Sequence, residues 1–285
     1  MNKTFFTIDS AGDLPQGIIE HCADIQVIPL YIILGDKSFR DGITVFAEDI
    51  IDYVEKTNAL PKTSAATVGD YFSVFSRLTD EGFDVVHISL SSKISSSFQN
   101  ALITSQDFDN VYVVDSLCLS SAMALLLLKG CEMRDLGFSA EETAKELERA
   151  RSSVVTTFII DKLDYLHKGG RCSALSVLGA NALGIKPCIG MHEGSLHVQK
   201  KYRGRLLQCQ LTYIDDILTY YGDKIDYSTA ILGYTPGLSP ENEKFLKNRI
   251  KENHSFKEIL VAQPGCTITS HCGPNTLAVF FMINA

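Results

Sequence analysis

Three short, largely apolar segments, each ending in a small polar cluster, constrain the fold of this chain more than any other feature. The segments are Phe5–Ile8, Val85–Leu90 and Val111–Val114, and the clusters that follow them are Asp9-Ser10, Ser91-Ser92 and Asp115-Ser116. Apolar runs of this length between polar turns are typical of strands buried on both faces of a parallel sheet. Ligands of open parallel sheets lie beyond the carboxyl ends of the strands, so we expect a hydroxyl-rich ligand crevice at that edge.

Capping patterns predict where helices begin between these strands. Thr67-Val68-Gly69-Asp70 fits the capping-box pattern, and Ser96-Ser97-Phe98-Gln99 fits it again further along the chain. Apolar residues then continue at helical spacing after both starts. We therefore expect one helix to begin close to Thr67 and another close to Ser96, directly above the strand that ends at Leu90.

The second half of the chain has a different pattern. A charged helix is predicted from Ser139 toward Arg151, and a strand from Val154 to Ile160, so we place a domain boundary after residue 153. The elements expected beyond it are a hairpin of Ile185–Met191 and Leu196–Tyr202 around Glu193-Gly194, a helix over Leu206–Tyr221, a strand over Thr229–Tyr234, a helix after Ser239-Pro240 and two closing strands. The predicted fold class is α/β in two domains: residues 1–153 with a parallel sheet, and residues 154–285 as an α+β domain with a mixed sheet.

Composition narrows the classes of function. The 34 acidic residues outnumber the 26 Lys and Arg, giving a net charge of −8, which argues against nucleic-acid binding. The longest apolar segment, Ala122–Leu128, is far shorter than the roughly 20 residues of a membrane helix, so a cytoplasmic location is expected. The eight cysteines contain no CxxC pair, so we predict buried, reduced thiols, no metal site and no cofactor.

Several polar groups allow two interpretations from the residues alone. The hydroxyls of Thr63-Ser64 and Ser95-Ser96-Ser97 either cap helices or, at one sheet edge, bind an anion such as a carboxylate or phosphate. Asp9 and Asp115 are either an acid–base pair or acceptors for loop N–H groups. Gly169-Gly170 indicates a turn with positive φ. The cationic runs around Arg171 and Arg203 are either solvated surface or a binding site for a phosphate or for an acidic partner surface.

Nine segments, in order along the chain, resemble the DegV family. They are Thr7–Pro15, Pro29-Leu30, Phe39–Gly42, Lys62–Ser64, Ser91–Ala101, Tyr165–Ser173, Ile185–Pro187, Tyr202–Arg205 and Ser270–Pro274. The chain departs from the family pattern at Ala65-Ala66, at Ser96-Ser97 and at Asn275. Ser96 replaces a family glycine, and its side chain either narrows the carboxylate end of the site or adds a hydroxyl donor.

The resemblance implies a lipid carrier rather than an enzyme. In FakB-type members of this family, one long-chain fatty acid lies in a buried tunnel between the two domains. By motif position, Thr63 and Ser95 would bind the carboxylate, with Ser96 and Ser97 beside them, and Arg203, His271, Gly170 and Arg171 would lie near it or face a partner. The implied partner is a separate fatty-acid kinase with a dihydroxyacetone-kinase-like subunit, which makes an acyl phosphate for phospholipid metabolism. Transient contact with a membrane surface is compatible with this role.

Two other functions compete with the carrier. One is a regulatory protein that senses lipid and contacts a different partner. The other is a hydrolase or transferase for a small carboxylate or phosphate that uses Asp9, Asp115 and His271.

Overall fold

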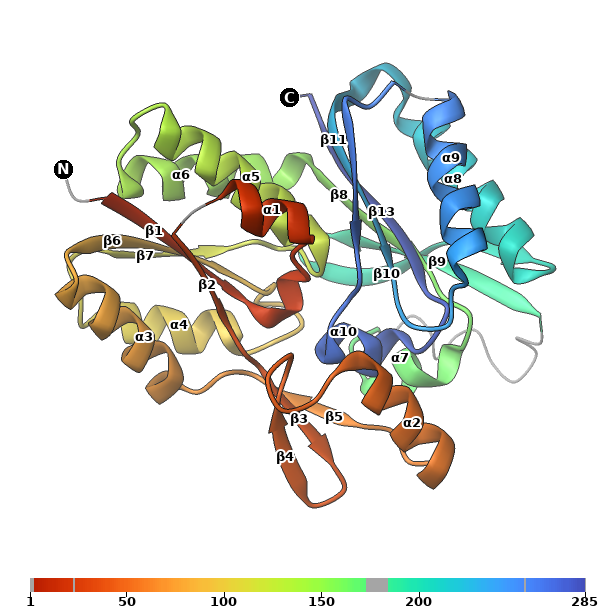
Figure 1. Cartoon of the computed structure of the whole chain (residues 1–285), viewed down its shortest axis with the longest axis horizontal. Coiled ribbons are helices and arrows are strands. Elements are labelled where there is room, and N and C mark those ends of the chain that lie inside the picture. The colour runs from red at the N-terminus through yellow and green to blue at the C-terminus, as the bar shows by residue number, and fades with distance from the viewer. Residues whose placement is uncertain (1–2, 23, 173–183, 254, 285) are drawn as a thin grey trace.

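The computed structural model describes residues 3–22, 24–172, 184–253 and 255–284. Within these ranges the chain forms three sheets, of four, six and three strands (Figure 1). The four-stranded and the six-stranded sheet are built from the first and the second half of the chain, respectively. The small third sheet lies below both in the view of Figure 1.

The four-stranded sheet is parallel throughout, with the order β2-β1-β6-β7. Its strands are β1 (Lys3–Asp9), β2 (Ile25–Ile28), β6 (Phe83–Ser89) and β7 (Val111–Asp115). Three of these are the strands predicted from the apolar segments, which confirms the parallel sheet of the first half. Asp9, Ser91 and Asp115 therefore lie at one edge, as the pattern required.

Helices cover both faces of this sheet. They are α1 (Gln16–His21), α3 (Val68–Asp80), α4 (Ser97–Ser105), α5 (Ser121–Asp135) and α6 (Ala140–Ala150). In Figure 1, α3 and α4 lie on one face, and α1, α5 and α6 lie on the other. The helix predicted at Thr67 has a capping box in which Thr67 accepts from the N–H of Asp70. The second predicted helix begins at Ser97, but the Ser96 side chain makes no cap because its backbone (φ −86°, ψ 2°) lacks the extended conformation of a cap.

The six-stranded sheet is mixed, with the order β10-β9-β8-β13-β11-β12. Its strands are β8 (Val154–Ile159), β9 (Ile185–His192), β10 (Ser195–Arg203), β11 (Ile225–Tyr234), β12 (Glu258–Ala262) and β13 (Leu277–Ile283). The α-helices in the described part of this half are α7 (Leu163–Gly169), α8 (Leu206–Tyr221), α9 (Pro240–Asn253) and α10 (Cys266–Cys272). The predicted hairpin, helices and closing strands are confirmed, whereas α7 and α10 were not predicted.

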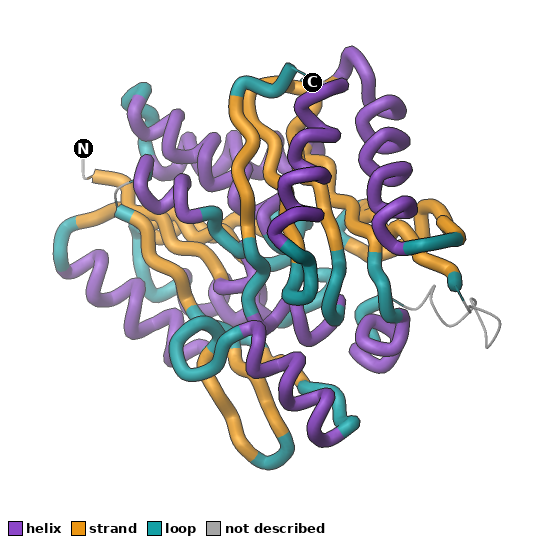
Figure 2. The backbone as a smooth tube through the Cα atoms, turned by 45° about the vertical axis from the view of Figure 1, so that its right-hand side comes forward, coloured by secondary structure: helices purple, strands orange, loops and turns teal. Residues whose placement is uncertain are grey.

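The third sheet was also not predicted. It is antiparallel with the order β4-β3-β5. Its strands are β3 (Tyr31–Leu34), β4 (Lys37–Arg40) and β5 (Lys62–Ser64), and helix α2 (Ala47–Thr57) connects β4 to β5. The β3–β4 hairpin protrudes from the bottom of the molecule in both views (Figure 2). Thr63 therefore lies in a strand, so of its two interpretations the one as a helix cap is wrong.

The largest hydrophobic core extends across both large sheets. It includes Phe6 and Leu126 from the first half, together with Phe158, Ile189 and Phe280 from the second. Helix α5 contacts strands of both sheets, which explains why most of its residues are buried. Strand β8 begins at Val154, next to the proposed boundary, but because the core is shared, the division into two domains stays a prediction.

Two cysteines depart from expectation. Cys22, at the end of α1, and Cys131, in α5, form a disulfide across a Cα–Cα distance of 6.4 Å, although only thiols were predicted. These helices lie far apart in sequence, and their packing could not be foreseen from spacing. The other six cysteines are buried, as expected. Among the described residues, no helix has the length and apolar character needed to cross a membrane.

Candidate functional site

A cavity of about 240 Å³ lies where elements of the three sheets meet. Its walls come from β5, the loops after β6 and β7, and β8, β10 and α10. The lining residues are Leu30, Thr63, Ser64, Ala65, Leu90, Ile94, Ser95, Ser96, Leu119, Phe158, Leu166, Arg171, Leu196, Thr267, Ile268, His271 and Cys272.

The cavity is polar at one end and apolar at the other. Ser64, Ser96 and Arg171 are solvent-exposed, so they mark the open end. Leu119, Phe158, Ile268 and Cys272 are each at least nine-tenths buried, and they also line a small adjoining cavity that reaches Phe280. A ligand with a polar head and an apolar tail matches this arrangement.

A hydroxyl and an imidazole meet at the cavity wall. The Oγ1 atom of Thr63 in β5 lies 2.8 Å from Nε2 of His271 in α10, across 208 positions of sequence. Burial, together with the positive charge of Arg171, lowers the pKa of His271 to about 4. The imidazole is therefore neutral at neutral pH. His271 contributes a hydrogen-bonding group to the cavity wall and no positive charge.

Two buried acidic side chains hold the helix that carries His271. Asp41 accepts hydrogen bonds from the N–H of Cys266 (2.8 Å), from the N–H and hydroxyl of Thr267 (3.1 and 2.6 Å) and from the Ser10 hydroxyl (2.9 Å). Asp13 accepts from the N–H of Gly265 (2.8 Å) and from the Ser120 hydroxyl (2.5 Å). Side-chain oxygens of Asp13 and Asp41 thus accept from free N–H groups at the N-terminus of α10, so the first half of the chain positions this helix. Sequence reasoning assigned these residues no role, although both lie in segments that resemble the family.

The raised pKa of Asp13 predicts that the stability of the protein depends on pH. Burial, together with the nearby charge of Asp41, raises its pKa from 3.8 to about 8. Between these two pH values the folded protein holds a proton that the unfolded chain releases, so the contribution of Asp13 to stability falls as pH rises. We expect Asp13→Asn to remove this decline, which is at most roughly 1.4 kcal/mol per pH unit. Urea unfolding of both proteins at pH 5 and pH 8 measures the difference.

The control for this prediction is Asp36→Asn, a carboxylate in the exposed turn between β3 and β4. It should leave the slope of stability against pH unchanged. Equal slopes for Asp13→Asn and the unmodified protein would mean that Asp13 is ionised in the folded state.

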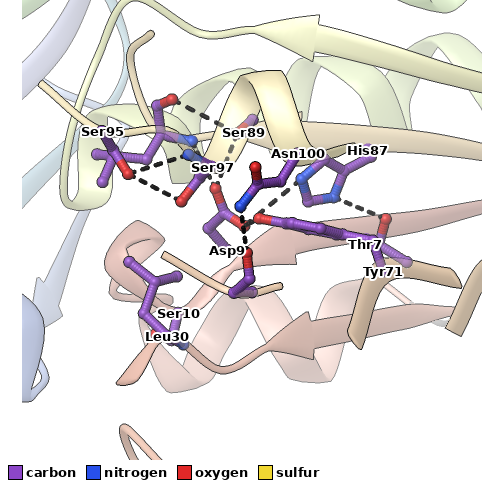
Figure 3. Close-up of polar contacts among 12 residues, drawn as sticks. Thr7, Asp9, Ser10, Leu30, Tyr71, His87, Ser89, Ser95, Ser97 and Asn100 are labelled. Carbon is purple, nitrogen blue, oxygen red and sulfur yellow. Dashed lines mark hydrogen bonds and ion pairs between the residues drawn. The ribbon is translucent and has the colours of Figure 1, made fainter. Parts of the chain in front are cut away.

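A chain of hydrogen bonds leads from the cavity wall into the parallel sheet (Figure 3). Ser95 accepts from the N–H of Ser97 (3.1 Å), and the two hydroxyl oxygens lie 2.9 Å apart. The buried Ser97 hydroxyl interacts with that of Tyr71, which donates to Asp9 across 2.6 Å. Either hydroxyl of the Ser95–Ser97 pair can be the donor, so the Ser95 proton points to Ser97 or away from it toward the cavity.

Asp9 anchors the inner end of this chain. Burial alone would raise the pKa of its carboxyl, but His87, the Tyr71 hydroxyl and the N–H of Leu90 together hold that pKa below its ordinary value. Ser89 also donates to it, across 2.9 Å. Asp9 is thus a buried, ionised acceptor at the carboxyl ends of β1 and β6.

We expect Tyr71→Phe to destabilise the protein by about 1.5–3 kcal/mol, because it removes a donor from a buried carboxylate. Equilibrium urea unfolding gives the value. Tyr220→Phe is the matched control, since the Tyr220 side chain is 75% exposed and should cost almost nothing. A loss no greater than that of the control would show that the Tyr71 hydroxyl does not support Asp9.

Of the remaining residues predicted for the site, some line the cavity and others lie outside its wall. Ser96 and Arg171 line the cavity, and Arg171 donates to the carbonyl of Gly169 across 2.6 Å. Ser97 lies behind the wall, and Gly170 ends α7 with φ of 71°, as the turn interpretation required. Arg203 is exposed at the end of β10, opposite Ile185, and is not among the described residues that line the cavity.

The acid–base residues of the enzyme alternative are not brought together. Asp115 accepts from the N–H groups of Ser92 (3.1 Å) and Leu117 (3.2 Å), which matches its alternative role as a loop acceptor. Asp9 is fully buried, and neither Asp9 nor Asp115 is among the described residues of the cavity wall that contains His271. The geometry gives that alternative no shared site.

Residues 4–284 match the model of a family described as uncharacterised proteins of the DegV family. The chain belongs to the DegV family. A fatty acid-binding protein of Thermotoga maritima is 30% identical to it over 96% of each chain. Two solved structures are also similar over the full length of both chains. One, from Thermus thermophilus, is described by its fatty acid binding (25% identity, TM-score 0.88), and another, from Thermotoga maritima, as revealing a fatty acid binding function (27% identity, TM-score 0.83).

Proposed function

We propose that this DegV protein binds one long-chain fatty acid with its tail in the cavity and its carboxylate at Thr63 and Ser95. The observation that carries the proposal is a single cavity with hydroxyls and His271 toward its open end and apolar side chains at its inner end. Each methylene buried contributes about 0.8 kcal/mol, so the tail supplies affinity and the hydroxyls need only hold the head. The fatty acid-binding relatives support the same ligand class.

The proposed ligand lies between the domains 1–153 and 154–285. Support comes from the origins of the lining residues, since Thr63 and Ser95 belong to the first range and Arg171 and His271 to the second. Ser96 would add a hydroxyl at the open end, where it is exposed.

The proposed role is to present the carboxylate to a separate, ATP-dependent fatty-acid kinase. The head-group end must then be reachable, and the exposure of Ser64, Ser96 and Arg171 supports this. A cation at that end suits the acyl phosphate product, whose charge needs pairing. Exposed Arg203 is proposed as part of the surface that meets the kinase.

Solvent extraction of the purified protein, followed by mass spectrometry, tests the ligand. We expect about one long-chain fatty acid per chain, or uptake of oleate by delipidated protein. Neither bound lipid nor uptake would overturn the proposal. Adding ATP and a kinase subunit, then trapping acyl phosphate with hydroxylamine, tests the carrier role, and bound lipid that never forms a hydroxamate would favour the lipid sensor.

A further inference from the structure

The two glycines that end α7 are glycines for different reasons. Gly170 has φ of 71°, which favours glycine, whereas Gly169 is the last helical residue and has no positive φ. Glycine in a helix is less favourable than alanine, so the backbone gives no reason for it at position 169. A side-chain contact must explain it.

That contact is with His271, because α7 packs against α10 (Figure 1). A Cβ atom built on Gly169 would lie 2.4 Å from Nδ1 of His271 and 3.2 Å from its Cε1. Real Cβ atoms essentially never come this close to another heavy atom, so only glycine leaves the ring in place. One Cα hydrogen of Gly169 therefore points at Nδ1.

The position of this hydrogen decides which nitrogen of the neutral imidazole carries the proton. Nδ1 is buried and has no hydrogen-bond partner in the part of the chain that the structure describes. A proton on Nδ1 would face the Gly169 hydrogen without an acceptor, whereas a bare lone pair there receives a weak C–H contact. The proton then lies on Nε2, which donates to Thr63 across 2.8 Å.

We propose that Gly169 is a positioning residue that fixes His271 as the Nε2–H tautomer, and so makes Thr63 a hydrogen-bond donor toward the cavity. When Nε2–H donates to Oγ1, the Thr63 proton is free to point at a ligand. In the opposite tautomer Thr63 would donate to Nε2 and present only lone pairs, which repel a carboxylate. The tautomer is inferred from contacts within the protein alone, whereas its effect on binding rests on the proposed fatty-acid function.

Nitrogen NMR of protein with ¹⁵N-labelled histidine tests the tautomer directly. Long-range ¹H–¹⁵N correlations at pH 7 should show His271 with its proton on Nε2, and His271→Gln assigns the signal by its loss. A proton on Nδ1, or on both nitrogens, would overturn the proposal. This measurement needs no ligand and no glycine variant, so it remains decisive even where fatty acid does not bind.

The consequence for binding is tested with oleate. Gly169→Ala should weaken oleate binding about tenfold, since the ring must move away from Thr63. Gly69→Ala is the matched helical control, because a Cβ there meets only the Thr67 hydroxyl at an ordinary 3.8 Å, and it should leave affinity unchanged.

A double-mutant cycle separates positioning from general damage to α7. In a His271→Gln background the flexible amide has no ring to displace, so Gly169→Ala should cost less than about threefold in oleate affinity. Equal losses in both backgrounds would show that Gly169 does not act through His271. Absence of oleate binding by the unmodified protein would refute the proposed function but leave the NMR result standing.

Discussion

Thr63→Val is expected to weaken fatty-acid binding by about tenfold to a hundredfold, the largest single loss among the side chains at the polar end of the cavity. A hydrogen bond to a charged group contributes about 1.5–3 kcal/mol, and valine keeps the shape of threonine while removing the hydroxyl. The variant also leaves Nε2 of His271 without the partner it has at 2.8 Å. Titration of delipidated protein with a fluorescent fatty acid measures the effect.

Thr212→Val is the matched control for this prediction. The Thr212 hydroxyl bonds within α8 to the carbonyl of Gln208, so the same substitution there should leave affinity unchanged. If both variants bind like the unmodified protein, the carboxylate does not lie at Thr63, and the proposed orientation of the ligand is wrong.

Asp41→Ala is expected to destabilise the protein by about 3–5 kcal/mol and to abolish fatty-acid binding. The carboxylate accepts from Ser10, from the N–H of Cys266 and from both groups of Thr267, and alanine would leave these four donors without their acceptor. Because they lie at the start of α10, their loss should release the helix that carries His271. Urea unfolding and ligand titration of the same preparation measure both effects.

Asp52→Ala provides the comparison for Asp41. Its carboxylate pairs with Lys56 on the surface of α2, and such exposed pairs contribute less than about 1 kcal/mol. If the Asp41→Ala protein is no less stable than the Asp52→Ala protein, α10 is held by its apolar contacts alone.

The elements that sequence predicted well are those whose signals are local. Thr67 and Asp70 cap each other within one turn, and Glu193 and Gly194 both have positive φ, as a tight hairpin turn requires. The helix over Leu206–Tyr221 was predicted with the bounds that the structure has. In each case the residues that decide the structure are neighbours in the chain.

The elements that were missed depend on distant partners. Strand β5 has only three residues, Lys62, Thr63 and Ser64, and its pairing with β3 is not encoded in any apolar pattern. Helix α10 is rich in β-branched residues, which favour strands, but Asp13 and Asp41 cap it from positions more than 200 residues away. Local propensity was overridden there by tertiary hydrogen bonds.

The candidate site was predicted in part for the same reason. Family-like segments pointed to Thr63, Ser95 and His271, which line one cavity. Sequence could not tell which of three consecutive serines faces the ligand, since Ser95 and Ser96 line the wall while Ser97 bonds inward. Nor could the sequence show that Asp9 is the acceptor at the inner end of the hydrogen-bond chain that begins at Ser95.

The separation of Thr63 and His271 by 208 positions has a consequence for biosynthesis. A ribosome must add 208 residues after Thr63 before His271 exists, and α10 can dock only after it has left the exit tunnel. A nascent chain thus cannot form this pair until both segments have left the ribosome. A polypeptide that terminates before residue 271 would lack the pair altogether.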